Sequence, residues 1–421
     1  MKGESAFPRY LEYKDSGIEW LGELPATWDI MPLKRIASLK SGESINSDSI
    51  EDTGEYAVYG GNGLRGYTSR YTHDGIYPLV GRQGALCGNV NYSVGKFWAS
   101  EHAVVVSPTR RLNTYWLGEL LRAMNLNQYS IAAAQPGLSV EAVSNLFVPT
   151  PPLPEQQAIA SFLDRETAKI DTVIEKQQRL IALLTEKRQA VISHAVTKGL
   201  DPNAQMKDSG IEWLGMVPEH WEVTRLGYYA TVENGTTPSR DNPEYWFDGD
   251  VPWLSSAEVN QYVVTEASEY ITEAALKACS LRLLPNESLI VGMIGEGKTR
   301  GMSALLKIEA TINQNLAGII PRQSVRSDYL HYAFQTAYLY LREAGRGGNQ
   351  AAMNCEILRA MMSPIPPIGE QTAIATFLTT ETARIDTLIA KANQSIELMK
   401  ERRSALISAA VTGKIDVRQV A

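Results

Sequence analysis

The sequence predicts an α+β fold in which two mixed α/β domains are joined by two long helices. We expect these helices to pair as an antiparallel coiled coil and to give the chain pseudo-two-fold symmetry. The first observation is that the nine residues KDSGIEWLG occur at Lys14–Gly22 and again at Lys207–Gly215. The second is that EQQAIASFLDRETAKIDTVI, beginning at Glu155, recurs as EQTAIATFLTTETARIDTLI, beginning at Glu370. One structural unit is therefore written twice.

The spacing of the two repeats divides shared from variable sequence. The first element recurs after 193 residues, from 14 to 207, and the second after 215 residues, from 155 to 370. The second unit thus carries 22 extra residues (215 minus 193), and all of them lie between the shared elements. We expect the shared parts to be scaffold and the variable parts to read two different things. The predicted boundaries are 1–150 and 201–364 for the domains, and 151–200 and 365–421 for the helices.

Composition limits the class of protein. With 421 residues, 44% hydrophobic and 21% charged, the chain has a normal globular composition and is too long for one core. No run of eighteen apolar residues occurs and the start MKGESAFPRY has no signal-peptide core, so we expect a cytoplasmic protein. Three cysteines at no ligand spacing suit a reducing compartment. The net charge of −7 requires any nucleic-acid role to use local basic patches or a partner's charge.

A proline cluster precedes each predicted helix, PTPPLPEQ ending at Gln156 and SPIPPIGEQ ending at Gln371. Proline is well placed at the first position of a helix, and the dipole there favours Glu155 and Glu370. Neither proline nor glycine then interrupts the sequence as far as Lys198 or between Gly369 and Thr412. Each helix of about 45 residues would rise about 67 Å.

Apolar residues in both helices follow a heptad repeat, which predicts a coiled-coil seam. Extra isoleucines widen the stripe and favour docking of further helices from a partner. The predicted helix–helix and partner interface consists of Ile159, Leu163, Ile170, Val173, Ile174, Leu180, Ile181, Leu184, Val191, Ile374, Leu378, Ile385, Leu388, Ile389, Ile396, Met399 and Leu406.

No catalytic constellation is convincing. The segment Gly292–Thr299 matches the phosphate-loop pattern, but Gly301 stands where its helix should begin, so a tight basic loop is the better interpretation. Asn242–Tyr245 is one residue from the loop that amino-methyltransferases use to hold an extruded base, yet a plain turn explains Pro243. The five histidines are scattered, which predicts no metal site.

The variable regions instead carry polar and basic residues on glycine-rich loops. Arg and Gln are the residues whose paired hydrogen bonds match guanine and adenine edges, although any single one is more often a solvated loop residue. The tryptophans Trp98, Trp246 and Trp253 are expected in the core. The predicted DNA-binding residues are Arg65, Tyr67, Arg82, Gln83, Lys96, His102, Arg240, Ser255, Lys298, Thr299, Arg300, Gln314 and Asn315.

Taken together, these motifs resemble the specificity subunit of type I restriction-modification systems. Both proline-led helices carry the family's Glu-Gln, Ile-Ala, Phe-Leu and Ile-Asp signature, and the resemblance covers essentially the whole chain. VGRQGALCGNVNY and KFWASEHAVVV in the first domain, and VGMIGEGKTRGM and INQNLAGII in the second, resemble its target-recognition domains.

The resemblance implies that each domain reads one half of a split, asymmetric site in double-stranded DNA. The helices would set the gap and dock methyltransferase subunits, two of them by the symmetry, with restriction subunits as further partners. The chain would be non-catalytic and without cofactors, and the methyl donor, ATP and Mg²⁺ would belong to partner subunits. Two alternatives stay open at this point: a coiled-coil interaction hub that does not bind DNA, and an enzyme that uses Gly292–Thr299 for a nucleotide.

Overall fold

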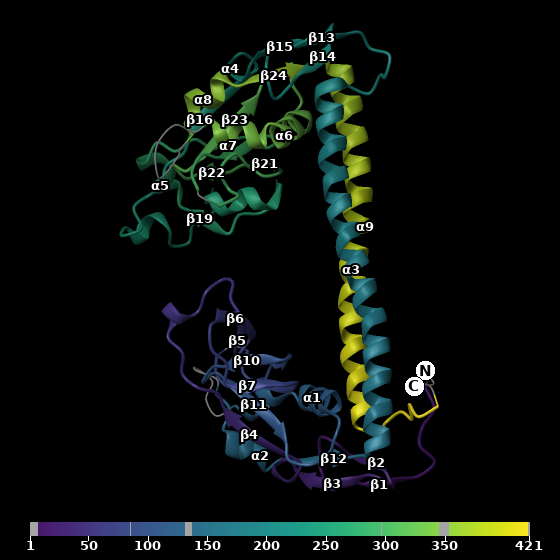
Figure 1. Ribbon diagram of the computed structural model, residues 1–421. Coiled ribbons are helices and arrows are strands. Elements are labelled where there is room, and N and C mark those ends of the chain that lie inside the picture. The colour runs from purple at the N-terminus through teal and green to yellow at the C-terminus, as the bar shows by residue number, and fades with distance from the viewer. Residues whose placement is uncertain (1–6, 85, 131–136, 296, 345–352, 420–421) are drawn as a thin grey trace. The chain divides into compact units, whose positions relative to one another are not determined.

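The computed structural model describes residues 7–84, 86–130, 137–295, 297–344 and 353–419. The chain divides into two compact units, Met1–Gln178 with Asn393–Ala421 (unit 1) and Arg179–Ala392 (unit 2). Each unit contains one α/β domain and about half of each of two long helices, α3 (Leu153–Lys198) and α9 (Ile368–Val411) (Figure 1). The structure has a long helix at each of the two places where the sequence predicts one, with 46 residues in α3 and 44 in α9.

The repeated nine residues form the same hairpin in both units. β1 (Tyr13–Asp15) pairs antiparallel with β2 (Glu23–Pro25), and β13 (Met206–Asp208) pairs antiparallel with β14 (Met216–Pro218). The turn residues Gly17 and Gly210 have φ of 65° and 69°, where only glycine is unstrained. Their amides donate to Oδ1 of Asp15 and Asp208 at 3.0 Å in each copy. Identical sequence therefore gives identical local structure.

Unit 1 holds two four-stranded sheets, ordered β6-β5-β10-β7 and β4-β11-β8-β9, and the pair β12-β3. Its core gathers Trp28, Trp116 and Leu120 of the domain with Ile159 and Leu163 of α3. The remaining elements of unit 1 are β3 (Asp29–Pro32), β4 (Ala37–Ser41), β5 (Tyr56–Gly60), β6 (Gly63–Thr68), β7 (His73–Asp74), β8 (Tyr77–Gly81), β9 (Val90–Ser93), β10 (Lys96–Ala99), β11 (Ala103–Pro108), α1 (Thr114–Ala123), α2 (Val140–Ser144) and β12 (Phe147–Thr150).

Unit 2 holds a five-stranded sheet, β16-β23-β20-β21-β18, a three-stranded sheet, β19-β17-β22, and the pair β15-β24. Its larger core joins Trp221, Tyr329 and Phe334 to Ile374 and Leu378 of α9. The remaining elements of unit 2 are β15 (Glu222–Arg225), α4 (Leu226–Tyr229), β16 (Ala230–Asn234), β17 (Val251–Leu254), β18 (Val263–Val264), β19 (Glu269–Ile271), α5 (Glu273–Ala278), β20 (Leu289–Gly292), β21 (Ser303–Leu306), β22 (Thr311–Ile312), β23 (Leu316–Pro321), α6 (Ser327–Thr336), α7 (Tyr338–Glu343), α8 (Cys355–Ala360) and β24 (Met362–Ile365).

Matching backbone hydrogen bonds show which positions of the two domains correspond. Ser100 N donates to Tyr59 O at 2.9 Å, and Asn313 N donates to Leu254 O at 3.0 Å. Likewise Arg82 N donates to His102 O, and Met293 N to Asn315 O, both at 2.9 Å. From Tyr59 to Arg82 the chain advances 23 positions, against 39 from Leu254 to Met293. Sixteen of the 22 extra residues (39 minus 23) therefore lie in this one segment, where unit 2 forms β18, β19 and α5.

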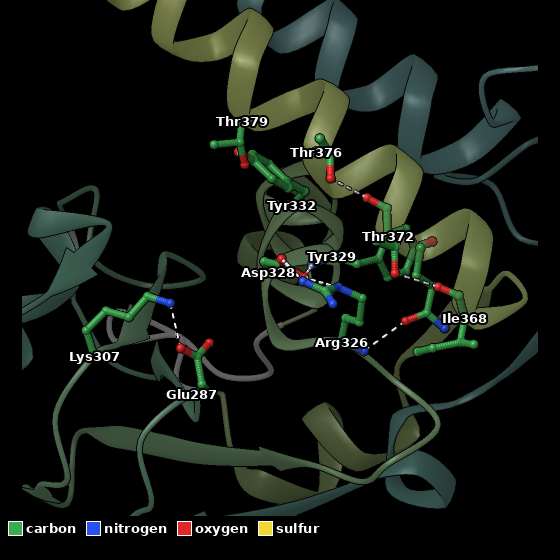
Figure 2. Close-up of polar contacts among 11 residues, drawn as sticks. Glu287, Lys307, Arg326, Asp328, Tyr329, Tyr332, Ile368, Thr372, Thr376 and Thr379 are labelled. Atoms are coloured by element: carbon green, nitrogen blue, oxygen red, sulfur yellow. Dashed lines mark hydrogen bonds and ion pairs between the residues drawn. The ribbon is translucent and has the colours of Figure 1, made fainter.

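The Gln of each repeated Glu-Gln pair ties its long helix to a domain helix. Gln371 Oε1 accepts from Arg326 N, just before α6, at 2.8 Å, and Gln156 Oε1 accepts from Asn113 N, just before α1, at 2.9 Å. Both glutamines are buried. Farther along α9, Tyr332 Oη lies 3.3 Å from Thr379 Oγ1, so α6 stays against the long helix (Figure 2).

Within each unit the early turns of one long helix pack beside the late turns of the other. In unit 1, Ile159 and Leu163 share a core with Ile407 and Val411. Two ion pairs continue this contact: Arg403 Nε to Asp171 Oδ1 at 3.1 Å in unit 1, and Arg188 Nε to Asp386 Oδ1 at 3.0 Å in unit 2. In the described ranges, no helix is both long and apolar enough to span a bilayer.

Candidate nucleic-acid interface

Four loops meet at one edge of the unit 1 domain, and we name them loop cluster 1: Gly42–Glu43, Gly60–Asn62, Arg82–Gln83 and Ser100–His102. Glu43 N donates to Ala99 O, and Arg82 N to His102 O, both at 2.9 Å. A Cβ at Gly42 would lie 2.1 Å from the carbonyl oxygen of Ala99, so only glycine permits this approach. The glycine-rich loops singled out in the sequence are therefore brought together by backbone contacts.

Unit 2 builds the equivalent arrangement, loop cluster 2, from Gly235–Thr237, Met293, Thr299 and Asn313–Asn315. Thr236 N donates to Ile312 O at 3.0 Å, and a Cβ at Gly235 would lie 2.0 Å from the same oxygen. Thr237 Oγ1 donates to Gln314 Oε1 at 2.5 Å. Both domains thus hold the turn before their central strand, β11 or β23, against a close-packed glycine.

Three of the six DNA-binding residues predicted in the first domain belong to loop cluster 1. Arg82 and Gln83 adjoin His102, and the Arg65 side chain lies over Gly60, because a Cβ there would be 2.5 Å from Arg65 Cδ. Tyr67 lies farther along β6. Lys96 begins β10 and places its Nζ 4.7 Å from the ring centre of Tyr71.

Arg82 and His102 are already in contact with polar partners. Arg82 Nη1 donates to Ser41 Oγ at 3.1 Å, and His102 Nε2 lies 3.1 Å from Glu101 Oε1. Half-buried side chains held in this way are presented in a fixed geometry.

In the second domain Gln314 and Asn315 belong to loop cluster 2, and Thr299 packs against Gly292. Lys298 and Arg300 flank Thr299 on the same loop, and the Lys298 carbonyl accepts from Tyr338 Oη at 2.9 Å. This loop therefore presents an exposed Lys298 beside the cluster.

Two of the predicted DNA-binding residues, Arg240 and Ser255, already form hydrogen bonds within their own domain. Arg240 donates twice to Glu269, at 2.6 and 3.0 Å, and its guanidinium lies 3.7 Å from the ring centre of Trp246. Ser255 Oγ accepts from Ala257 N at 3.3 Å, at the start of the 3-10 helix Ser256–Gln261. These contacts neutralise the charge of Arg240 and use the hydroxyl of Ser255 locally. A DNA-contacting role for any of the thirteen residues stays a prediction.

Sequence reasoning missed residues of loop cluster 1 that the structure singles out. Ser100 Oγ, Glu101 Oε2 and Asn91 Nδ2 are buried without a hydrogen-bond partner. Buried polar atoms are nearly always paired, so the two unpaired atoms in the adjacent residues Ser100 and Glu101 of loop cluster 1 call for an explanation, such as a ligand. The signal in the sequence was a wholly polar tripeptide, Ser-Glu-His or Asn-Gln-Asn, between two apolar strands.

The fold does not support the hypothesis that Gly292–Thr299 is a phosphate loop. After β20 ends at Gly292 the chain turns back into β21, which pairs antiparallel with β20. A phosphate loop requires a helix to begin there. Asn242 Oδ1 accepts from Glu244 N at 3.2 Å, which makes the Asn242–Tyr245 segment a capped turn. Among the described residues no group of three or more His, Cys, Asp or Glu side chains could hold a metal ion.

Burial along the long helices is uneven. The predicted interface residues that are buried are Ile159, Leu163, Ile170, Ile374, Leu378, Ile385 and Ile396. Val173, Leu180 and Leu388 are 39%, 43% and 44% exposed, so these three are not enclosed between the helices. Their use by a partner stays a prediction. Trp98 and Trp253 are buried as expected, whereas Trp246 is half-buried under Arg240.

The fold is that of a two-domain protein in which each domain carries a loop cluster, and the two clusters are similar in backbone and different in side chains. The model of the type I restriction modification DNA specificity domain matches residues 25–182 and 218–398, and the chain belongs to that family.

Individual relatives agree with this assignment. The chain is 42% identical over 147 residues to the type I restriction enzyme EcoprrI specificity subunit of Escherichia coli, a match covering 34% of this chain and 37% of that protein. It is 22% identical over 441 residues to the EcoBI specificity subunit of Escherichia coli, covering 96% of this chain and 90% of that one. The chain spans less than half the length of three of these relatives: 37% of the EcoprrI subunit, 43% of the MjaIX subunit and 42% of the EcoR124I/EcoR124II subunit.

A solved chain from work on complex assembly and conformational transition of the type I R-M system has the same fold. The TM-score is 0.71 at 16% identity, with 92% of this chain and 98% of that chain covered. This likeness supports the mixed α/β fold with long helices.

Proposed function

We propose that the chain is the DNA-specificity subunit of a type I restriction-modification complex and that each domain reads one half of a bipartite, asymmetric site in double-stranded DNA. The observation that carries this proposal is the pair of loop clusters. They occupy corresponding positions in the two domains, yet their side chains differ, as two readers of unlike half-sites require. The target-recognition domains are 1–150 and 201–364, and the spacer helices are 151–200 and 365–421.

The long helices would form one antiparallel coiled coil with pseudo-two-fold symmetry. The two ion pairs support this arrangement, because moving 215 positions along the chain turns Arg188 into Arg403 and Asp171 into Asp386. The repeat therefore relates each residue of one ion pair to the residue of the same type in the other pair. Two contacts on either side of a two-fold axis are related in this way. A bar of this kind would separate the readers by a fixed distance along the duplex.

Methyl transfer and cleavage would be carried out by other subunits. Two methyltransferase subunits would dock on the exposed apolar residues of the helices, and restriction subunits would join them. The exposed positions Val173 and Leu388 support a pair of such docking sites, because they correspond under the 215-residue repeat. This chain would need no cofactor, while the methyl donor, ATP and Mg²⁺ would bind to its partners in the cytoplasm.

A domain exchange tests the proposal. Replacing Asp29–Val148 with the corresponding segment of another family member, with the methyltransferase subunits co-expressed, should alter one half of the methylated genomic motif and leave the other half and the gap unchanged. Reciprocal replacement of Glu222–Met362 is the matched control and should alter the other half only. If neither exchange changes the motif, the domains do not read DNA.

A gel-shift assay separates this function from that of an interaction hub. The assembled chain and methyltransferase subunits should shift duplex DNA containing the mapped motif more strongly than a duplex with both halves scrambled. Equal shifts of both duplexes, or none, would favour the hub.

A further inference from the structure

We propose that two corresponding turns, Ser100–His102 and Asn313–Asn315, select a base in their respective half-sites, through Glu101 in the first domain and Gln314 in the second. This inference rests on the proposed function, because it names the residues that distinguish one reader from the other.

The two turns occupy the same place in their domains. Each follows a short strand that pairs in parallel, β10 with β5 and β22 with β17, and each leads into the central strand β11 or β23. Each closes with the same backbone hydrogen bond, Ala103 N to Ser100 O at 2.9 Å and Leu316 N to Asn313 O at 3.2 Å. Glu101 therefore corresponds to Gln314, and His102 corresponds to Asn315.

The surroundings of the two turns are alike in backbone and unlike in side chains. Gly42 and Gly235 face the turns so closely that a Cβ would lie 2.6 Å from Ser100 O in the first domain and 2.5 Å from Asn313 O in the second. Neither glycine can carry a side chain there, so the turn itself supplies the chemistry. A backbone of the same shape that carries different side chains suits the recognition of different sequences. Base choice depends on the hydrogen-bonding groups of the side chains and not on the backbone that holds them.

Glu101 presents acceptors only. Its Oε1 is engaged by His102 Nε2 at 3.1 Å, while its Oε2 is buried and unpaired, and the neighbouring Ser100 Oγ is unpaired as well. The Glu101 side chain is 36% exposed, so a change of rotamer would bring the unpaired oxygen to the surface, where a donor from a ligand would relieve the cost of leaving it unpaired. In the major groove the partner of a carboxylate is the N4 amino group of cytosine.

Gln314 presents both a donor and an acceptor. It is exposed, its Oε1 accepts from Thr237 Oγ1, and its Nε2 has no hydrogen-bond partner among the residues that the structure describes. A carbonyl oxygen has a second lone pair, so Oε1 can still accept from another group. An amide placed in this way matches adenine, donating to N7 and accepting from the N6 amino group.

The test exchanges the two side chains. Glu101→Gln and Gln314→Glu are made singly in the full chain, co-expressed with its methyltransferase subunits, and the methylated motif is mapped across the genome. Glu101→Gln should convert one cytosine of the first half-site to adenine, and Gln314→Glu should convert one adenine of the second half-site to cytosine. For each variant, methylation of sites with the new base at this position, relative to sites with the original base, should rise about tenfold or more. The other half-site should not change in either case.

Matched controls are Glu51→Gln and Gln323→Glu, which make the same chemical changes at exposed positions outside the loop clusters. Both should leave the motif unchanged. If a turn variant methylates the original motif in both halves, the inference is wrong. Where a variant methylates nothing, the assembled complex is instead used to select from randomised duplexes, and an unchanged selected base would overturn the inference. Absence of any bipartite motif with the unmodified chain would contradict the proposed function itself.

Discussion

Trp28 donates from its indole Nε1 to Glu155 Oε2 at 2.7 Å, across 127 residues of sequence, and holds the start of α3 against the turn between β2 and β3. The second copy of the repeat does the same, with Trp221 Nε1 2.9 Å from Glu370 Oε2. The two carboxylates differ in their remaining partners. Glu155 is buried and also accepts from Tyr10 Oη at 3.1 Å, whereas Glu370 is half-buried and lies 2.7 Å from His220 Nε2.

We predict that Trp28→Phe destabilises unit 1 by about 1–3 kcal/mol, because it leaves a buried carboxylate oxygen short of a donor. Urea unfolding of the full chain, followed by hydrogen exchange in peptides of α3, measures the loss. Trp221→Phe is the matched control and should cost less, since water can reach Glu370. Equal losses in the two variants would contradict the role assigned to burial.

A charge reversal tests how the long helices pair. Asp171→Arg brings two arginines together at Arg403, and adding Arg403→Asp should restore the pair in reversed order. Because these side chains are partly exposed, at 54% and 30%, the coupling should be only about 0.2–1 kcal/mol. A double-mutant cycle on thermal unfolding measures it, with Asp171→Arg combined with Arg188→Asp as the control that has no designed partner. Coupling in the control equal to that of the restored pair would exclude the contact.

The sequence predicted the long helices well and the contacts of individual side chains less well, for physical reasons. Repetition, proline position and heptad spacing are local signals, and a long helix follows each of the two proline clusters, α3 from Leu153 and α9 from Ile368. Sequence reasoning gave Glu155 a role at the helix dipole but did not find its bond to Trp28, since a contact across 127 residues leaves no local pattern. Arg240 illustrates the same limit: the sequence suggested a base reader from its residue type, but it could not indicate that Glu269 and Trp246 contact the side chain within the domain.

His331 should make the stability of unit 2 depend on pH. Its imidazole is buried in α6 with Nδ1 3.1 Å from Ser303 Oγ, and burial, with a smaller contribution from Arg188, lowers its pKa from 6.5 to about 4. In the unfolded chain the His331 imidazole therefore binds a proton as the pH falls below 6.5, whereas in the folded chain it does so only near pH 4. The stabilisation is complete above pH 6.5 and is lost as the pH falls towards 4.

We predict that His331→Asn flattens this dependence. Between pH 7 and pH 5 the unmodified chain should lose about 2 kcal/mol more stability than the variant. Urea unfolding at the two values measures the difference, and His194→Asn, which changes an exposed histidine, is the control and should track the unmodified chain. A variant with the same pH dependence as the unmodified chain would show that His331 binds its proton at the same pH in the folded and the unfolded chain.

The last prediction tests the proposed spacer role of the long helices. In the proposed antiparallel pairing, the ion pairs Asp171–Arg403 and Arg188–Asp386 exchange under the repeat, so the symmetric centre would fall next to Arg179 in α3 and Gln394 in α9. Four residues inserted after both of these positions lengthen the bar by about 6 Å, a little more than one helical turn, while each half keeps its own contacts. The gap in the methylated motif should then grow by about two base pairs, with both half-sites unchanged.

An insertion into one helix alone is the informative comparison. It would lengthen one side of the pair while Asp171 and Arg188 still face Arg403 and Asp386, so one helix must bulge at the centre. The gap should then change less than with the double insertion, and the complex should melt at a lower temperature. A double insertion that leaves the gap unchanged, or that alters a half-site, would show that the helices do not set the spacing.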